Sequence, residues 1–147
     1  MSKKTLLQKI ASKKALQKAW DNLDKHNKSS HGLSGETIEI FSLNKDEKIA
    51  AITKKLIEKK YKFSPSRPVA IRKSDKASYR PLQIPEITDR IVIKAIAMEL
   101  EDIFKNTLLK SKGYYSFAYQ KKTSIQDAIS KIEEYYKKGY KYCLKAD

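Results

Sequence analysis

Hydrophobic residues recur every three or four positions in four parts of the chain, which is the spacing of one face of an α-helix. One of these parts runs from Asp89 to about Phe104 and is apolar around most of its circumference. A helix of that kind is buried, so it is predicted to be the spine of the core. The other predicted helices have a single apolar face. They cover residues 6–23 (as one helix or two), 49–60 and 125–136.

Short polar residues mark the boundaries of these helices. Asn44 and Ser124 are each followed three residues later by an acid, which predicts two N-capped helix starts. A cluster of Ser, Gly and Asn at residues 26–35 predicts a loop. Residues 37–41, directly after that loop, are predicted to be either extended or a helical turn.

Alternation of side-chain type predicts the β-structure. Residues 69–73 and 79–84 are predicted to be the two strands of a short hairpin, joined by a polar turn at residues 74–78. Pro81 favours an edge position for the second strand, because proline has no N–H to donate. A further strand is predicted at residues 140–147. Helices combined with a small antiparallel hairpin predict an α+β fold.

The composition indicates a polyanionic partner. The chain has 147 residues, room for one domain, and 40% of them are hydrophobic, which excludes a disordered tail. Its 32 Lys and Arg against 17 Asp and Glu give a net charge of +15. That charge favours binding to nucleic acid or to an anionic membrane face. The alternative is that the lysines only solvate helix surfaces.

Cysteine use and hydropathy bear on location. The single cysteine, Cys143, excludes an internal disulfide and predicts a reducing, cytoplasmic location. No hydrophobic run approaches transmembrane length, and we expect no membrane partner. Lysines interrupt the apolar runs of the first twenty residues, and we expect no signal peptide.

The predicted hairpin carries two cations suited to a polyphosphate, Lys73 and Arg80. A triphosphate needs fixed positive charge near its outer phosphates, and arginine adds planar, bidentate donation. Whether the two side chains share a face depends on the register across residues 74–78, which the sequence does not fix. The alternative is an exposed basic hairpin that binds no nucleotide.

Short sequence blocks follow one another in a family-like order along most of the chain. They are Ala19-Trp20, residues 27–41, Tyr61-Lys-Phe-Ser-Pro65, Val69-Ala-Ile-Arg-Lys73, Tyr79-Arg-Pro-Leu-Gln-Ile-Pro85, Asp89-Arg-Ile-Val92, Leu100-Glu-Asp-Ile-Phe104, Ser116-Phe-Ala-Tyr-Gln120, Ser124-Ile-Gln-Asp-Ala-Ile129 and Leu144-Lys-Ala-Asp147. In this order and at these spacings they resemble the N-terminal portion of a reverse transcriptase of the group II intron and retron-like bacterial kind. The order carries the resemblance, since no single block is decisive.

The resemblance implies the fingers and the beginning of the palm of a right-hand polymerase. Residues 1–44 would be an N-terminal helical and loop extension, residues 45–113 the fingers, and residues 114–147 the start of the palm. The implied activity is that of an RNA-directed DNA polymerase, a nucleotidyltransferase. Such polymerases also need the paired aspartates of a second palm motif, a primer grip and a thumb. We therefore expect the 147-residue chain alone to be inactive.

The resemblance also assigns roles to single residues. Lys73 and Arg80 match the fingers residues that contact the triphosphate of the incoming dNTP. Asp147 matches the first catalytic aspartate, and a carboxylate that leaves a strand is a hard oxygen ligand suited to Mg²⁺, the cofactor of the complete polymerase. Further basic residues are expected to contact nucleic-acid phosphates. These are Lys60, Lys62, Arg67, Arg72 and Arg90.

Two residues at the start of the long helix are left with alternatives. Asp89 is expected to cap the helix or to pair with a neighbour. Arg90 is expected either to reach template phosphate or to fold back onto Asp89.

The expected partners are an RNA template, a DNA or RNA primer and dNTP, with a C-terminal palm and thumb chain as a further candidate. Two alternatives to a polymerase portion stay open. One is a non-catalytic RNA- or DNA-binding module that reuses the fingers. The other is a split-polymerase subunit that completes its palm with another chain.

Overall fold

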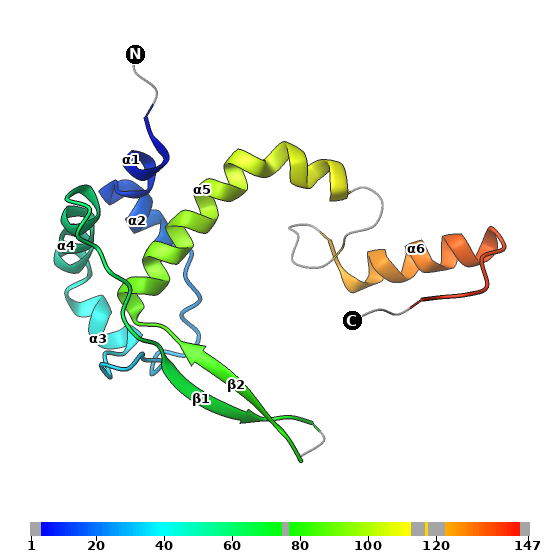
Figure 1. Cartoon of the computed structure of the whole chain (residues 1–147), viewed down its shortest axis with the longest axis horizontal. Helices are drawn as coiled ribbons and strands as arrows, with labels where there is room; N and C mark the ends of the chain where they lie inside the picture. The colour runs from blue at the N-terminus through cyan, green and yellow to red at the C-terminus, as the bar shows by residue number, and fades with distance from the viewer. Residues whose placement is uncertain (1–3, 75–76, 113–116, 118–122, 145–147) are drawn as a thin grey trace. The chain divides into compact units, whose positions relative to one another are not determined.

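The structure, a computed structural model, describes residues 4–74, 77–112, 117 and 123–144, without the side chains of residues 108–112 (Figure 1). Contacts divide the chain into two compact units, Met1–Asp102 and Ile103–Asp147. Helices combine with one two-stranded antiparallel sheet, so the predicted α+β class is confirmed. The expected functional boundaries after residues 44 and 113 stay predictions.

The first unit contains four short helices and the first part of a long one. They are α1 (Leu6–Ile10), α2 (Lys13–Asp21), α3 (Ile38–Leu43), α4 (Lys45–Ile57) and α5 (Ile87–Lys112). The hydroxyls of Thr5, Ser12 and Thr37 accept hydrogen bonds from the first turns of α1, α2 and α3. These bonds satisfy N–H groups that have no partner inside the helix. Of the two predictions for residues 37–41, the helical one is therefore confirmed.

The predicted side-chain cap at Asn44 is wrong. Asn44 has φ −124° and ψ 31° and makes no side-chain cap hydrogen bond to α4. A capping residue needs extended backbone, but Asn44 also ends α3, where its N–H donates to the carbonyl of Phe41 at 3.3 Å. Because α4 follows α3 directly, one residue serves as the end of one helix and the start of the next.

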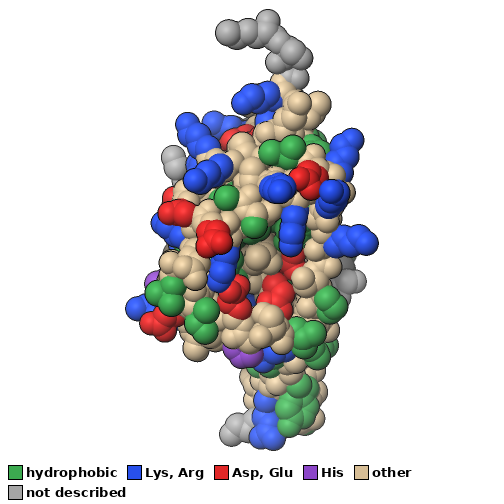
Figure 2. Space-filling view, turned by 90° about the vertical axis from the view of Figure 1, so that its left-hand side faces the viewer, with side chains coloured by type: hydrophobic (Ala, Val, Ile, Leu, Met, Phe, Trp, Pro, Cys, Tyr) green, Lys and Arg blue, Asp and Glu red, His purple; other side chains and the backbone are tan. Residues whose placement is uncertain are grey.

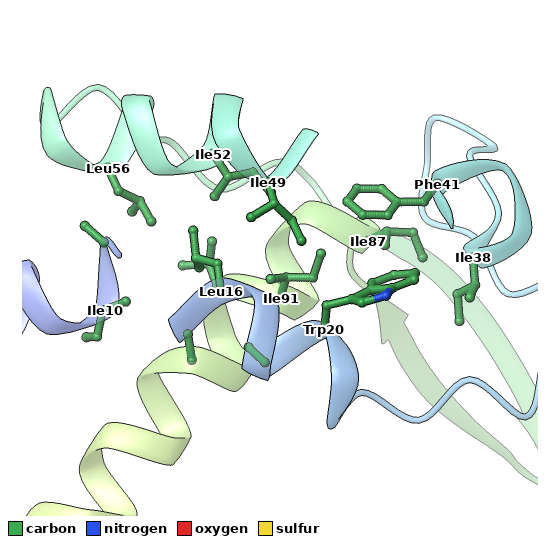
Figure 3. Close-up of a cluster of buried hydrophobic side chains, with 14 residues drawn as sticks. Ile10, Leu16, Trp20, Ile38, Phe41, Ile49, Ile52, Leu56, Ile87 and Ile91 are labelled. Atoms are coloured by element: carbon green, nitrogen blue, oxygen red, sulfur yellow. The ribbon is translucent and has the colours of Figure 1, made fainter. Parts of the chain in front are cut away.

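Side chains from all five helices of the first unit meet in one core (Figure 3). The rings of Trp20 and Phe41 stack with their centroids 5.0 Å apart and an interplanar angle of 30°, which is favourable for a buried aromatic pair. Ile87 and Ile91 bring the start of α5 into the same cluster. The other labelled members are Ile10, Leu16, Ile38, Ile49, Ile52 and Leu56. This core fixes α4 and the first turns of α5, which precede and follow the two strands in the chain.

The prediction that α5 is buried around most of its circumference is wrong, because only one side is buried even in its first turns. Ile91, Val92 and Ala95 are buried, but Ile93 is 47% and Leu100 is 37% exposed. Apolar residues occur on all sides of α5, whereas the core of the first unit forms along one side of its N-terminal part. The start of α5 therefore belongs to the core through one side only.

The first unit also contains an antiparallel hairpin of β1 (Arg67–Arg72) and β2 (Tyr79–Ile84), which projects away from the helices (Figure 1). In its register Ile71 lies opposite Arg80. Since the sheet has two strands, Pro81 lies on an edge strand, as predicted.

The second unit contains α6 (Ile125–Lys137), which begins at the predicted capping box. The hydroxyl of Ser124 accepts from the N–H of Asp127 at 3.2 Å, and the Asp127 carboxylate accepts from the N–H of Ser124 at 2.7 Å. Residues 140–144, predicted to belong to a strand, are not in one. A strand satisfies its backbone groups by pairing, and the described part of this unit contains no second strand. The strand prediction is wrong for these residues, and residues 145–147 lie outside the described part.

Candidate nucleotide and nucleic-acid interface

Lys73 and Arg80 lie on the same face of the hairpin. Arg80 lies opposite Ile71, and the N–H of Lys73 donates to the carbonyl of Ser78 at 2.9 Å, which continues the register by one pair. Opposite residues of an antiparallel pair share a face, as do residues two apart along a strand. Lys73 and Arg80 are therefore diagonal neighbours. Both are exposed, and neither side chain has a polar partner among the described residues.

An apolar strip lies on the same face, beside the two cations. Val69 lies opposite Leu82 and precedes Ile71 on this face. Ile71 is 47% and Leu82 39% exposed, and hydrophobic side chains are visible along the hairpin with Lys or Arg near its end (Figure 2). An apolar surface that ends in two cations suits a nucleotide, whose base has apolar faces and whose phosphates are anionic.

Arg72 lies on the opposite face of the hairpin. It is paired directly with Tyr79. Its Nη2 donates to the Tyr79 hydroxyl at 3.1 Å, and the guanidinium lies 5.6 Å from the ring centroid. The structure therefore places Arg72, a predicted nucleic-acid contact, on the other side of the hairpin from Lys73 and Arg80.

A buried carboxylate joins the base of the hairpin to the loop before α3. Glu86 is 9% exposed and accepts hydrogen bonds from the N–H and the hydroxyl of Ser34, both at 2.7 Å. Burial raises the pKa of Glu86, but the hydrogen bonds from Ser34 and Leu33 and the charge of Arg90 outweigh it, so the pKa lies below its usual range. The ionised carboxylate fixes the loop to the segment between β2 and α5.

Gly32 leaves room for that carboxylate. A Cβ at Gly32 would lie 2.5 Å from Cδ of Glu86 and 2.7 Å from both carboxylate oxygens. Arg67, a predicted nucleic-acid contact and the first residue of β1, binds the same loop, since its Nε donates to the carbonyl of His31 at 3.3 Å. Both strands are thus anchored at the base of the hairpin, β1 through Arg67 and β2 through the segment that follows it.

Arg90 contacts the chain itself and not Asp89. Its Nε donates to the carbonyl of Pro85 at 3.0 Å and its Nη1 to the hydroxyl of Ser30 at 3.0 Å. Its Nη2 is buried and has no hydrogen-bond partner within the described part of the chain. Burial lowers the pKa of Arg90, although a guanidinium stays charged in proteins. Of the two positions expected for Arg90, the one in which its side chain folds back onto Asp89 is not observed.

Asp89 pairs with the segment that follows α4. Its side chain is 1% exposed and accepts from the Tyr61 hydroxyl at 2.5 Å and from the N–H of Ser64 at 3.0 Å. Burial and then the Asp89 carboxylate raise the pKa of Tyr61 far above its ordinary value, so the hydroxyl stays protonated and keeps donating. The prediction that Asp89 pairs with a neighbour is confirmed.

Lys60 and Lys62 lie on either side of Tyr61 in the same irregular segment. Nζ of Lys60 is 3.2 Å from a carboxylate oxygen of Glu58, and the two side chains are 75% and 37% exposed. An exposed pair of this kind contributes little to stability. Lys62 is exposed and has no acid partner in the part of the chain that the structure describes. Both residues stay predicted phosphate contacts.

Asp147, the predicted catalytic and Mg²⁺-binding residue, lies outside the described residues. Among the residues that are described, no three His, Cys, Asp or Glu side chains gather into a group that could hold a metal ion. Mg²⁺ stays a prediction of the resemblance. In the same part of the chain, no helix is both long and apolar enough to span a bilayer.

Sequence patterns did not identify Glu86, Ser34 and Gly32 as one structural unit. An acid directly before an apolar helix is normally a solvated residue near the positive end of the helix dipole. The one sign in the sequence was the position of Glu86 directly before the apolar residues of the long helix. Its partner lies 52 residues earlier, which no local pattern could indicate.

Comparison with protein-family models gives no match. The chain is similar to the COX1/OXI3 intron 2 protein of Saccharomyces cerevisiae, with 31% identity over 108 residues. The matched segment is 74% of this chain and 11% of that protein, so the chain spans about a tenth of the length of its relative. This similarity agrees with the intron-related part of the family resemblance described for the sequence.

Proposed function

We propose that the chain supplies the fingers of an intron-type reverse transcriptase, in which Lys73 and Arg80 contact the triphosphate of an incoming dNTP. One observation carries the proposal: the two cations are diagonal neighbours on one exposed face. The similarity to a yeast intron protein supports the class of polymerase. Synthesis of DNA on an RNA template, the Mg²⁺ it uses and the role of Asp147 all belong to this proposal.

The hairpin face would act by binding and positioning. Catalysis of phosphoryl transfer is mostly positioning plus electrostatic stabilisation of charge on the phosphate oxygens. The ammonium of Lys73 supplies a compact charge, and the guanidinium of Arg80 supplies a planar pair of donors. Ile71 and Leu82 give the base or sugar an apolar surface beside the cations.

An anchored base and an exposed outer part suit this task. Glu86 and Arg67 fix the root of the hairpin through hydrogen bonds to the loop before α3. Beyond that root the hairpin is exposed on both faces, and an isolated two-stranded hairpin is only marginally rigid. The cations can therefore adjust to a nucleotide while the direction of the hairpin is kept.

The test compares dNTP binding with RNA binding in the 147-residue chain. Lys73→Ala plus Arg80→Ala should lower the affinity for a fluorescent dNTP at least about tenfold, because two charge-assisted contacts are lost. Affinity for a long single-stranded RNA should fall less than about threefold, since other lysines contact its phosphates. Lys14→Ala plus Lys18→Ala removes the same charge from the exposed side of α2 and should change neither. Equal losses of dNTP affinity in both variants would contradict the proposal.

A second candidate function is a nucleic-acid-binding module without catalysis, which the net charge of +15 favours. In that case the wild-type chain binds RNA with a steep salt dependence and does not bind dNTP. The hairpin variant would then weaken RNA binding, because the same face would hold template phosphate.

A further inference from the structure

A pocket of about 290 Å³ opens between α4, the irregular segment after it and the first turn of α5. Four lysines and two hydroxyl side chains are among its lining residues, and we call it the lysine pocket. They are Lys48, Lys55, Lys60, Lys62, Ser64 and Thr88. The volume is near the lower limit of pockets that hold small molecules, which suits a phosphate group and its neighbours in a chain.

Two of the four ammonium groups have no acid partner among the residues that the structure describes. Lys48 and Lys60 each form an ion pair with a glutamate. Lys55 and Lys62 have no ion pair among the described residues, and no Asp or Glu lines the pocket. Positive charge in a concave site attracts anions more strongly than the same charge on a convex surface, because the protein walls focus the field.

The Asp89 carboxylate, which contacts two lining residues, is already satisfied by hydrogen bonds. Asp89 is 1% exposed and accepts from the Tyr61 hydroxyl and from the N–H of Ser64. These two bonds fix the chain on both sides of Lys62, so this wall of the pocket is set before a ligand arrives. A preformed site loses less entropy on binding. Thr88, in the first turn of α5, adds the positive end of that helix dipole to the lining.

We propose that the lysine pocket binds a phosphate group of single-stranded RNA, as a second contact separate from the hairpin face. That the phosphate belongs to RNA rests on the proposed function. The chemistry is that of lysine and hydroxyl donors around a phosphate. The face of the first unit that includes α4 carries many Lys and Arg side chains (Figure 2). Since the hairpin projects away from the helices (Figure 1), a strand held at the lysine pocket leaves the hairpin face free for the nucleotide.

The first test measures how RNA affinity of the 147-residue chain depends on salt. Lys55→Ala plus Lys62→Ala removes the two unpaired cations of the pocket. Lys18→Ala plus Lys54→Ala is the matched control, because both are exposed lysines outside the pocket. Each lost phosphate contact reduces the slope of log affinity against log salt by about 0.7 for a single strand, so the pocket variant, which loses one phosphate contact, should lose about 0.7. The control should lose less than half as much, and equal losses would overturn the proposal.

The second test identifies the source of the phosphate by NMR titration of the ¹⁵N-labelled chain. RNA and inorganic phosphate should each shift the amide signals of Ser64 and Thr88, and these shifts should disappear in the pocket variant. A dNTP at the same concentration should shift hairpin signals first. Unmoved Ser64 and Thr88 signals with RNA, or larger shifts with dNTP than with RNA, would overturn the assignment to RNA. The pocket variant keeps Lys73 and Arg80, so its dNTP affinity tests the proposed function separately.

Discussion

Lys73 and Arg80 are diagonal neighbours across the β1–β2 hairpin, on the face opposite to Arg72. Residues in this relationship have backbone positions about 7–8 Å apart. Two long side chains at that spacing can reach the phosphates of one triphosphate together. The arrangement depends on the register, because a slip of one strand by one residue would move Arg80 to the other face.

Glu86→Gln tests the ionised anchor at the root of the hairpin. The pKa of Glu86 lies below its ordinary value of 4.5, so the carboxylate stabilises the fold above that pH. This contribution is lost as the pH falls through the folded-state pKa. Urea unfolding should show a steeper loss of stability below about pH 5 in the wild type than in the variant. Parallel pH profiles would contradict the role of the charge.

Gly32→Ala tests the close approach between Gly32 and Glu86. The new Cβ would lie 2.5 Å from Cδ of Glu86, and overpacking of this kind costs about 1–3 kcal/mol of unfolding free energy. In a Glu86→Ala background the clash is absent, so the same change should cost much less. A double-mutant cycle by chemical unfolding measures the difference. A coupling energy near zero would show that Gly32 is needed for another reason.

Tyr61→Phe tests the buried hydrogen bond to Asp89. The change leaves a buried carboxylate short of one donor and should lower the unfolding free energy by about 1–3 kcal/mol. Because the pKa of Tyr61 is raised above its ordinary value of 10.0, the stability it provides is complete below about pH 10 and is lost as the pH rises further. The variant should therefore show a smaller alkaline loss of stability. Tyr142→Phe, at a fully exposed side chain, is the control and should leave both quantities unchanged.

Arg90→Lys separates a structural role from an RNA contact. Lysine cannot donate to the carbonyl of Pro85 and the hydroxyl of Ser30 with the fixed fork of arginine. We expect a loss of about 1–2 kcal/mol in unfolding free energy, with RNA affinity of the folded protein changed less than about twofold. Thermal unfolding and RNA binding on the same sample check this. A tenfold loss of RNA affinity in a fully folded sample would place Arg90 at the RNA.

The helices could be predicted because their signals are local. Ser124 and Asp127 are three residues apart and form the predicted capping box. The capping signal failed at Asn44. This residue also ends α3, so its backbone does not adopt the extended conformation that a side-chain cap of α4 needs. The distribution of apolar residues overestimated the burial of α5, because it does not indicate which sides of a helix pack against other elements.

The candidate site could be predicted only in part. The residue types at Lys73 and Arg80 pointed to a polyphosphate, but their shared face depends on a register that is set by long-range pairing. The lysine pocket combines α4 with the first turn of α5, and Glu86 binds a residue 52 positions earlier. Such contacts follow from packing of the whole unit, which no local pattern contains.

The most direct measurement of the central claim is the dNTP affinity of three single variants of the hairpin. Lys73→Ala, Arg80→Ala and Arg72→Ala each remove one positive charge, but Arg72 lies on the opposite face and is paired with Tyr79. The account predicts a loss of about tenfold for each of the first two, the value of one charge-assisted contact, and less than about twofold for Arg72→Ala. A loss for Arg72→Ala as large as that for Arg80→Ala would contradict it, because net charge and not the Lys73–Arg80 face would then hold the nucleotide.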